Sequence, residues 1–312
     1  MKPLYPILEL GAAAFFVAAA WLALRRGRLP FLELVSAACF GLVLEEGDQL
    51  IFRTYHYAPD FALAIDRAPV AIGLTWALII AGAMRITDAL GVRRRYAPFV
   101  DSVLAIMLDL AFDAVAIRIG LWSWVGVGPH QGWFGVPAGN FYSWLLVTLG
   151  FTVLTRWLRE GADARPGLAW LQLLVPIPAF VILIAAIVPF AVVRPLLDPA
   201  PGSGLGLFAL TLAAFVALAA WGVWGPNRGV PDGQRTQIVD LRLAFLTRVV
   251  IELVFLGAML AIGLALAEPV LLAVALALLA AEVPLAQLVR HRLRGAVAPQ
   301  ERTATAGSPA LP

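Results

Sequence analysis

The sequence predicts an all-α protein, a polytopic bundle of about nine transmembrane helices. Three observations lead to this fold class: an apolar composition, apolar runs of bilayer length, and clusters of Arg that alternate with those runs. Of the 312 residues, 61% are hydrophobic and 14% are charged, and the mean hydropathy is +0.87. Soluble globular chains are nearer half apolar and a quarter charged. The composition therefore argues against a soluble enzyme, a disordered chain and a nucleic-acid-binding protein.

Nine runs of mostly apolar residues are long enough to cross a bilayer, which takes about 20 helical residues per span. The sixth and seventh are the clearest, because residues 166–193 and 199–227 contain no charged side chain. The first run holds Glu9 and is followed by an Arg cluster, so we expect a span and not a cleavable signal peptide. The runs lie at about 4–24, 31–52, 68–86, 98–120, 139–157, 168–192, 204–224, 242–266 and 268–289.

The positions of Arg and Lys predict the orientation. Four cations follow the even-numbered runs or precede the first, namely Lys2, Arg53, Arg67 and Arg194. Sixteen follow the odd-numbered runs, and by the positive-inside rule they mark the cytoplasmic side. We therefore expect an outside N-terminus, a cytoplasmic C-terminus and a multi-pass location in a bacterial inner membrane. The sixteen are Arg25, Arg26, Arg28, Arg93, Arg94, Arg95, Arg156, Arg159, Arg165, Arg228, Arg235, Arg242, Arg290, Arg292, Arg294 and Arg302.

The domain organisation is simple. We expect one transmembrane domain over residues 1–294 and a disordered cytoplasmic tail over 295–312, which is small, polar and contains Pro. The single cysteine, Cys39, excludes an internal disulfide and a cysteine-based metal site. The three histidines lie far apart and match no zinc spacing, so no metal site is expected.

Carboxyl groups inside the second run are the first candidates for chemistry, because ionisable groups in a membrane are costly and face protein or water. Glu45 and Asp48 are three residues apart and share a helix face, whereas Glu46 is rotated by about 100°. At least one of the three should keep its proton in a medium of low dielectric constant. The alternative is a hydrated helix end, since Arg53 follows closely.

The fourth run carries Asp109 and Asp113 on one helix face, one turn apart. If the second and fourth runs both begin at the cytoplasmic interface, a helical rise of about 1.5 Å per residue places Glu45 and Asp113 at a similar depth, about 21 and 22 Å. Arg118 could form a structural ion pair with Asp113. The second aspartate of the pair would then still have no cationic partner. In the eighth run, a second structural ion pair is expected between Arg248 and Glu252, four residues apart.

An aromatic segment follows the fourth run, with Trp122, Trp124, Trp133 and Trp144 interspersed with glycines, prolines and Asn140. An aromatic belt at the membrane surface would explain the tryptophans. An aromatic belt does not require the glycines, the prolines or Asn140. These residues suit a tight loop that covers a cavity. Aromatic side chains on the same side, with those of residues 55 and 57, could line a slot for a long apolar molecule and stabilise a positive charge on it.

Two stretches, 109–124 and 133–144, resemble a signature of the carotenoid biosynthesis protein family, which includes carotenoid 1,2-hydratases and bisanhydrobacterioruberin hydratase. The stretches 44–57 and 70–76 also fit, and the resemblance covers about residues 35–160. The chain departs from the hydratase pattern twice. Residues 48–54 replace a Gly- and Pro-rich stretch, and Ala114 stands where Pro commonly follows the aspartate.

The resemblance implies hydration of a terminal isoprenoid double bond of a carotenoid, a lyase reaction without a cofactor. Glu45, Asp109 and Asp113 are then the candidate catalytic residues, with the order of acid and base left open. The expected partners are a carotenoid and membrane lipid, not nucleic acid. The candidate substrate-binding residues are Tyr55, Tyr57, Trp76, Trp122, Trp124, Trp133 and Asn140.

Two other functions stay open at this point. The same carboxylates could form a relay in a proton- or cation-coupled transporter. Alternatively, the chain could be a non-catalytic membrane factor that holds a carotenoid or another isoprenoid for other enzymes.

Overall fold

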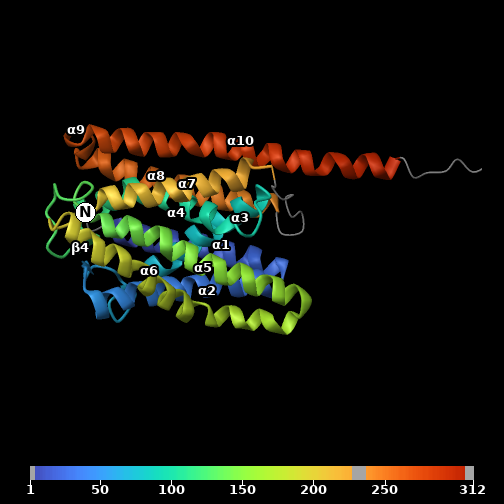
Figure 1. Ribbon diagram of the computed structural model, residues 1–312, viewed down its shortest axis with the longest axis horizontal. Coiled ribbons are helices and arrows are strands. Elements are labelled where there is room, and N and C mark those ends of the chain that lie inside the picture. Colours follow the sequence, from blue (N-terminus) through green and yellow to red (C-terminus); the bar gives the residue numbers. More distant parts are fainter. Residues whose placement is uncertain (1–3, 227–236, 306–312) are drawn as a thin grey trace, which may run out of the picture.

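A computed structural model describes residues 4–226 and 237–305 and confirms the all-α bundle. In these ranges, nine long helices coincide with the nine apolar runs (Figure 1). Lys2, Arg228 and Arg235, which contributed to the predicted orientation, lie outside the described residues. The long helices are α1 (Leu4–Arg26), α2 (Arg28–Gly47), α3 (Val70–Ala89), α4 (Ala97–Arg118), α5 (Ala138–Ala164), α6 (Pro176–Leu197), α7 (Leu205–Trp224), α8 (Ile238–Ala261) and α10 (Pro269–Thr305).

Short elements connect the long helices. The π-helix η1 (Asp48–Phe52) continues α2, the 3₁₀-helix η2 (Pro166–Leu174) precedes α6, and α9 (Leu264–Ala267) precedes α10. Figure 1 shows the start of α1, β4 and α9 at one end of the bundle and the last turns of α10 at the other. Two antiparallel pairs are formed by β1 (Tyr55–Tyr57) with β4 (Trp122–Trp124) and by β2 (Ala64–Ile65) with β3 (Ala68–Pro69).

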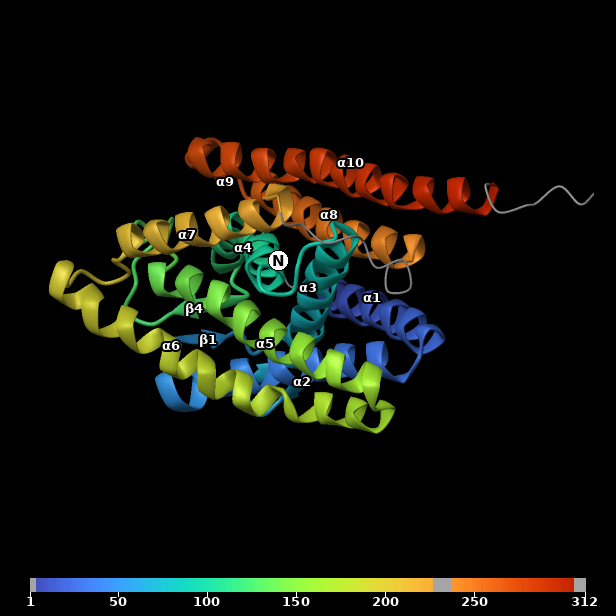
Figure 2. The same ribbon diagram turned by 45° about the vertical axis from the view of Figure 1, so that its right-hand side comes forward.

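Seven of the described helices are long and apolar enough to cross a membrane, namely α1, α3, α5, α6, α7, α8 and α10. The two other long helices, α2 and α4, carry several charged residues each. In Figure 2, α4 lies in the middle of the bundle, and it packs against α3, α5, α7 and α8. Its three aspartates, Asp101, Asp109 and Asp113, are buried among these helices and the cavity that they enclose, as is usual for ionisable groups within a membrane protein.

The span number and the orientation remain predictions that reporter fusions can test. A reporter that is active only outside the cytoplasm should give no signal when it is fused after Arg294. The same reporter inserted between Trp124 and Trp133 should be active, because that loop belongs to the opposite end of the bundle. The reverse pair of results would place the aromatic loop in the cytoplasm and refute the predicted orientation.

Two cations that we expected in a cytoplasmic loop are instead buried inside α5. Arg156 donates to Asp101 at 3.0 Å and to Asp88 at 2.5 Å, and Arg159 donates to Glu33 at 2.7 Å and to Asp88 at 2.8 Å. The helix continues past the point where the apolar run ends, because acids of α2, α3 and α4 meet these arginines. A buried network thus joins four helices.

Arg159→Met should lower the free energy of unfolding by about 3 kcal/mol, because the substitution removes the guanidinium that donates to both Glu33 and Asp88. Glu33 then keeps only the longer contact with Arg85, at 3.8 Å. Denaturant unfolding of the purified protein in detergent measures the loss. The matched control is Arg165→Met, since Arg165 is exposed. Equal stabilities of the two variants would show that the network is dispensable.

The two predicted structural ion pairs are wrong. Arg248 pairs with Glu282 of α10 at 2.8 Å, because α10 packs on α8 and presents that carboxylate across the interface. Neither carboxyl oxygen of Glu252 has a hydrogen-bond partner among the described residues. Arg118, the last residue of α4, donates to the carbonyl oxygen of Pro129 at 2.7 Å instead of pairing with Asp113.

The C-terminal segment differs in extent from the expected one. We expected disorder from residue 295, but α10 continues to Thr305. Residues 306–312, the rest of the expected tail, lie outside the described residues.

Candidate active site

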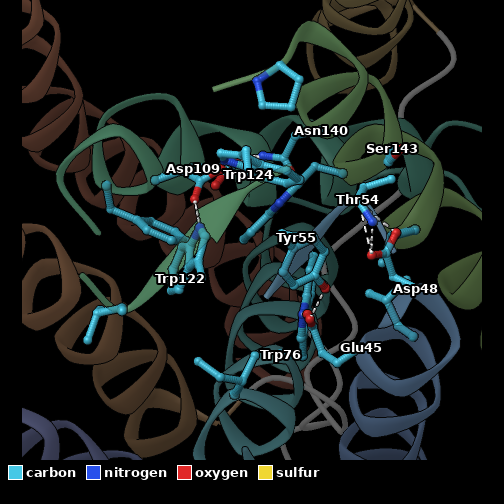
Figure 3. Close-up of a pocket in the computed structure, with 18 of the residues that line it drawn as sticks. Glu45, Asp48, Thr54, Tyr55, Trp76, Asp109, Trp122, Trp124, Asn140 and Ser143 are labelled. Carbon is cyan, nitrogen blue, oxygen red and sulfur yellow. Dashed lines mark hydrogen bonds between the residues drawn. The ribbon is translucent and has the colours of Figure 1, made fainter. Parts of the chain in front are cut away.

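A cavity of about 950 Å³ lies within the bundle, lined by residues of α1, α2, α3, α4, α5, α6 and α8 and of the loops near β1 and β4. Its wall is mostly apolar, and its volume is at the upper end of the range for small-molecule sites. Figure 3 shows the polar part of this wall. The polar lining residues include Glu45, Asp48, Thr54, Tyr55, Tyr57, Asp109, Asp113, Asn140 and Ser143.

Glu45, in the last turn of α2, is buried and accepts three hydrogen bonds. Its Oε2 atom accepts the hydroxyl groups of Tyr55 and, at 2.6 Å, Tyr57. Its Oε1 atom accepts the indole N–H of Trp76, from α3, at 2.6 Å. The two tyrosines alternate along β1, so both side chains point to the same side of the strand. Burial, followed by the nearby Glu45 charge, raises the pKa of both phenols well above the usual value, so they stay neutral donors.

The pairing of β1 with β4 adds two more aromatic rings to this side. Tyr55 lies opposite Trp124 and Tyr57 lies opposite Trp122. The ring centroids are 5.0 Å apart in the first pair and 5.8 Å in the second, and both pairs are edge-to-face. The intervening residues, His56 and Ser123, are exposed. The period of two along each strand thus places four aromatic side chains toward the cavity.

Asp109 and Asp113 are joined by one amide group. Asn140, in the first turn of α5, donates from Nδ2 to Asp109 at 3.0 Å and to Asp113 at 2.7 Å. Trp122 donates its indole N–H to the other oxygen of Asp113 at 2.7 Å. The Oδ1 atom of Asp109 is buried and has no hydrogen-bond partner among the described residues. This oxygen lacks the donor that a buried carboxyl oxygen normally has.

The structure brings nine of the ten proposed catalytic and substrate-binding residues to one cavity. The exception is Trp133, which does not line the cavity and instead donates its indole N–H to the carbonyl oxygen of Leu110 at 2.9 Å. It fixes the loop against α4. Glu46 also faces away, as its helical position predicts, and accepts the backbone N–H groups of Arg67 and Ala68.

Several lining residues were not among the candidate substrate-binding residues. Trp144, noted only as part of the aromatic segment, packs against Trp76 with ring centroids 4.2 Å apart and also contacts Phe112. It lies one helical turn beyond Asn140 on α5, so its spacing could have placed it in the site. Phe180 and Phe190 of α6 also line the cavity, but α6 is apolar on every face and its sequence marks no side.

The chemistry of the cavity is that of carboxyl groups, hydroxyl groups and aromatic rings. In the described part of the chain, no three His, Cys, Asp or Glu side chains are grouped so that they could hold a metal ion. Two carboxyl groups on one side and a third nearby can supply and accept protons at a molecule bound between them.

The comparisons with known proteins identify the family. No curated protein and no solved structure shows significant similarity to the chain. A family model, described as carotenoid biosynthesis protein, matches residues 1–208 of the 312, a longer stretch than the resemblance at residues 35–160. The match includes all the carboxyl groups of the cavity. The chain therefore belongs to the carotenoid biosynthesis protein family.

Proposed function

We propose that the protein is a hydratase, a lyase that adds water to a terminal isoprenoid double bond of a carotenoid without a cofactor. The observation that carries this proposal is the gathering of Glu45, Asp109 and Asp113 with aromatic rings on the wall of one apolar cavity. Family membership supports a carotenoid or a related isoprenoid as the substrate.

The reaction needs a proton donor and a proton acceptor. A carboxylic acid gives its proton to the less substituted carbon, so a C–H bond forms from the π electrons and a tertiary carbocation remains. The oxygen of water then bonds to that carbon, and the excess proton passes to a carboxylate. The sum is the addition of H and OH across the double bond, with no net electron transfer. Such general acid–base steps contribute about 10²–10⁴-fold each.

The hydrogen bonds support a division of roles. Asp109 and Asp113 lie one turn apart on the wall of a mostly apolar cavity, where two like charges are costly, so the pair suits the acid that retains a proton. Glu45 accepts three hydrogen bonds, which suits an ionised carboxylate that orients water and takes up its proton. Asn140 is a positioning residue, because its amide holds both aspartates.

The remaining wall suits a polyene. Aromatic faces near the carboxyl groups stabilise a carbocation by cation–π interaction. Apolar residues of α6, from Phe180 to Phe190, and of α8, from Val250 to Phe255, continue the lining. The residues from 180 to 190 span about 15 Å of helix at 1.5 Å per residue, which accommodates several isoprene units in an apolar setting.

Expression in a host that makes acyclic or monocyclic carotenes should convert part of the pigment into a more polar, hydroxylated product. Chromatography and mass spectrometry of the extracted pigments measure the conversion, with an Asp113→Asn and Glu45→Gln double variant as the inactive control. Unchanged pigments in several carotene backgrounds would contradict the proposal. If the purified protein then carried carotene, it would act as a non-catalytic carotenoid-holding factor.

A further inference from the structure

We infer that the carboxyl-lined part of the cavity binds lipophilic ammonium ions, that is, a protonated amine attached to an isoprenoid or alkyl chain. The inference deepens the proposed function and rests on it, since such an ion resembles the carbocation in charge and shape. Three features carry it: carboxyl groups without a counter-ion, a buried acceptor atom without a donor, and aromatic faces near both.

The carboxyl groups of the cavity have no counter-ion within it. Among the described residues, none of Glu45, Asp109 and Asp113 forms an ion pair, and all their hydrogen-bond donors are neutral. Charge that is buried without compensation favours a cationic ligand.

The two arginines that line the cavity lie at its edge. Arg53 is exposed, in the loop after η1. Arg194, in the last turn of α6, donates to the carbonyl oxygen of Ala200 and to the hydroxyl group of Ser203, each at 3.1 Å. Neither forms an ion pair with a carboxylate at the centre of the site, so the inner part of the cavity keeps its acidic character.

The free acceptor is the Oδ1 atom of Asp109. The residue is 0% exposed and lines the cavity, yet this oxygen receives no hydrogen bond among the described residues. A buried acceptor without a donor is unfavourable, because it has lost its hydrogen bonds to water and gained none from the protein. A tertiary ammonium ion carries one N–H group and one positive charge, so it can supply the missing donor and the counter-charge together. A neutral hydrocarbon supplies neither.

The aromatic rings provide the faces that ammonium ions prefer. In Figure 3, Tyr55 lies between the Glu45 side chain and the group formed by Asp109, Trp122 and Trp124. Tyr55 and Trp124 meet edge-to-face at 64°, and both line the cavity. Aromatic rings that line a site in this way bind alkylated ammonium groups by cation–π contact. The apolar wall beyond them suits the attached chain.

The test compares three ligands with the same geranyl-type chain and different head charges. They are N,N-dimethylgeranylamine, which is protonated at neutral pH, the hydrocarbon with CH in place of the nitrogen, and geranic acid. Quenching of tryptophan fluorescence in the full-length protein, in a non-ionic detergent, gives each Kd. The amine should bind at least about tenfold more tightly than the hydrocarbon, and the acid should bind most weakly. Equal affinities for amine and hydrocarbon would overturn the inference.

Two variants locate the bound ion. Asp109→Asn should remove most of the preference for the amine, whereas Glu252→Gln should keep it, because Glu252 does not line the cavity. An undiminished preference in Asp109→Asn would place the cation elsewhere and refute the site. The comparison of the three ligands on the unmodified protein needs no variant, so a variant that fails to fold leaves the test intact.

Carotene hydration, measured with the same preparation, separates the two proposals. A clear preference for the amine in a protein that hydrates none of the carotenes supports the ammonium site and refutes the hydratase. Hydration without any preference for the amine supports the hydratase and refutes the ammonium site.

Discussion

Asp113→Asn should lower carotene hydration by at least about 100-fold, the low end of the contribution of a general acid or base. The amide keeps the size of the side chain, but it has neither a transferable proton nor a charge. Asn140 and Trp122 both donate to Asp113, and the new amide can still accept from one of them. The protein should therefore insert and fold. Product formation by the purified variant measures the effect.

A matched control is Asp66→Asn, which changes an exposed aspartate of the loop between β2 and β3. It should retain normal turnover, and both variants should unfold within a few degrees of the unmodified protein. If Asp113→Asn retains near-normal turnover, its carboxyl group is structural and the acid must be another residue.

Glu45→Gln should reduce turnover by a similar factor, for a different reason. Tyr55 and Tyr57 both donate to one carboxyl oxygen, and Trp76 donates to the other. A glutamine amide offers one acceptor oxygen and one NH₂ group, which is a donor. At least one of the three protein donors would therefore face the NH₂ group and lose its acceptor. The substitution removes the charge and also disturbs the tyrosines. Steady-state turnover, with circular dichroism as the folding check, measures the loss.

The neighbouring residue provides the control for that variant. Glu46→Gln makes the same chemical change one position along α2, where the side chain faces away from the cavity and accepts backbone N–H groups. It should leave turnover within about twofold of normal, as expected for a change away from the reacting groups. Equal losses of turnover in the two variants would mean that turnover depends on the structure of the end of α2 and not on the Glu45 carboxylate.

The core of the site could be predicted from the sequence because it depends on helical periodicity. Asp109 and Asp113 share a helix face, and the helical rise places Glu45 at a similar depth. The pairing of β1 with β4, which orders the two tyrosines, was not predicted. The role of Asn140 as the bridge between the aspartates could not be derived, since it depends on how α5 packs on α4. Long-range packing also decided the partner of Arg248, which is Glu282 and not the helical neighbour Glu252.

In the fold, too, the features set by local sequence could be predicted and those set by long-range packing could not. The apolar runs predicted the long helices found within residues 4–226 and 237–305, because bilayer length is a strong local signal. Arg156 and Arg159 were interpreted as loop cations because they lie at the end of the fifth run and just after it. Their burial depends on acids of three other helices, which the sequence does not reveal. The π-helix after α2 and the left-handed conformation of Arg53, at φ 54°, have no comparable signature in the sequence.

The most direct measurement of the central claim is the origin of the oxygen in the product. Purified protein, a carotene in detergent and water enriched in ¹⁸O are incubated without any added cofactor, and the product is analysed by mass spectrometry. The account predicts a product heavier than the carotene by one molecule of water, with ¹⁸O in proportion to the enrichment of the solvent. A hydroxylated product whose oxygen comes from O₂, or no product at all while the carotene stays bound, would contradict it.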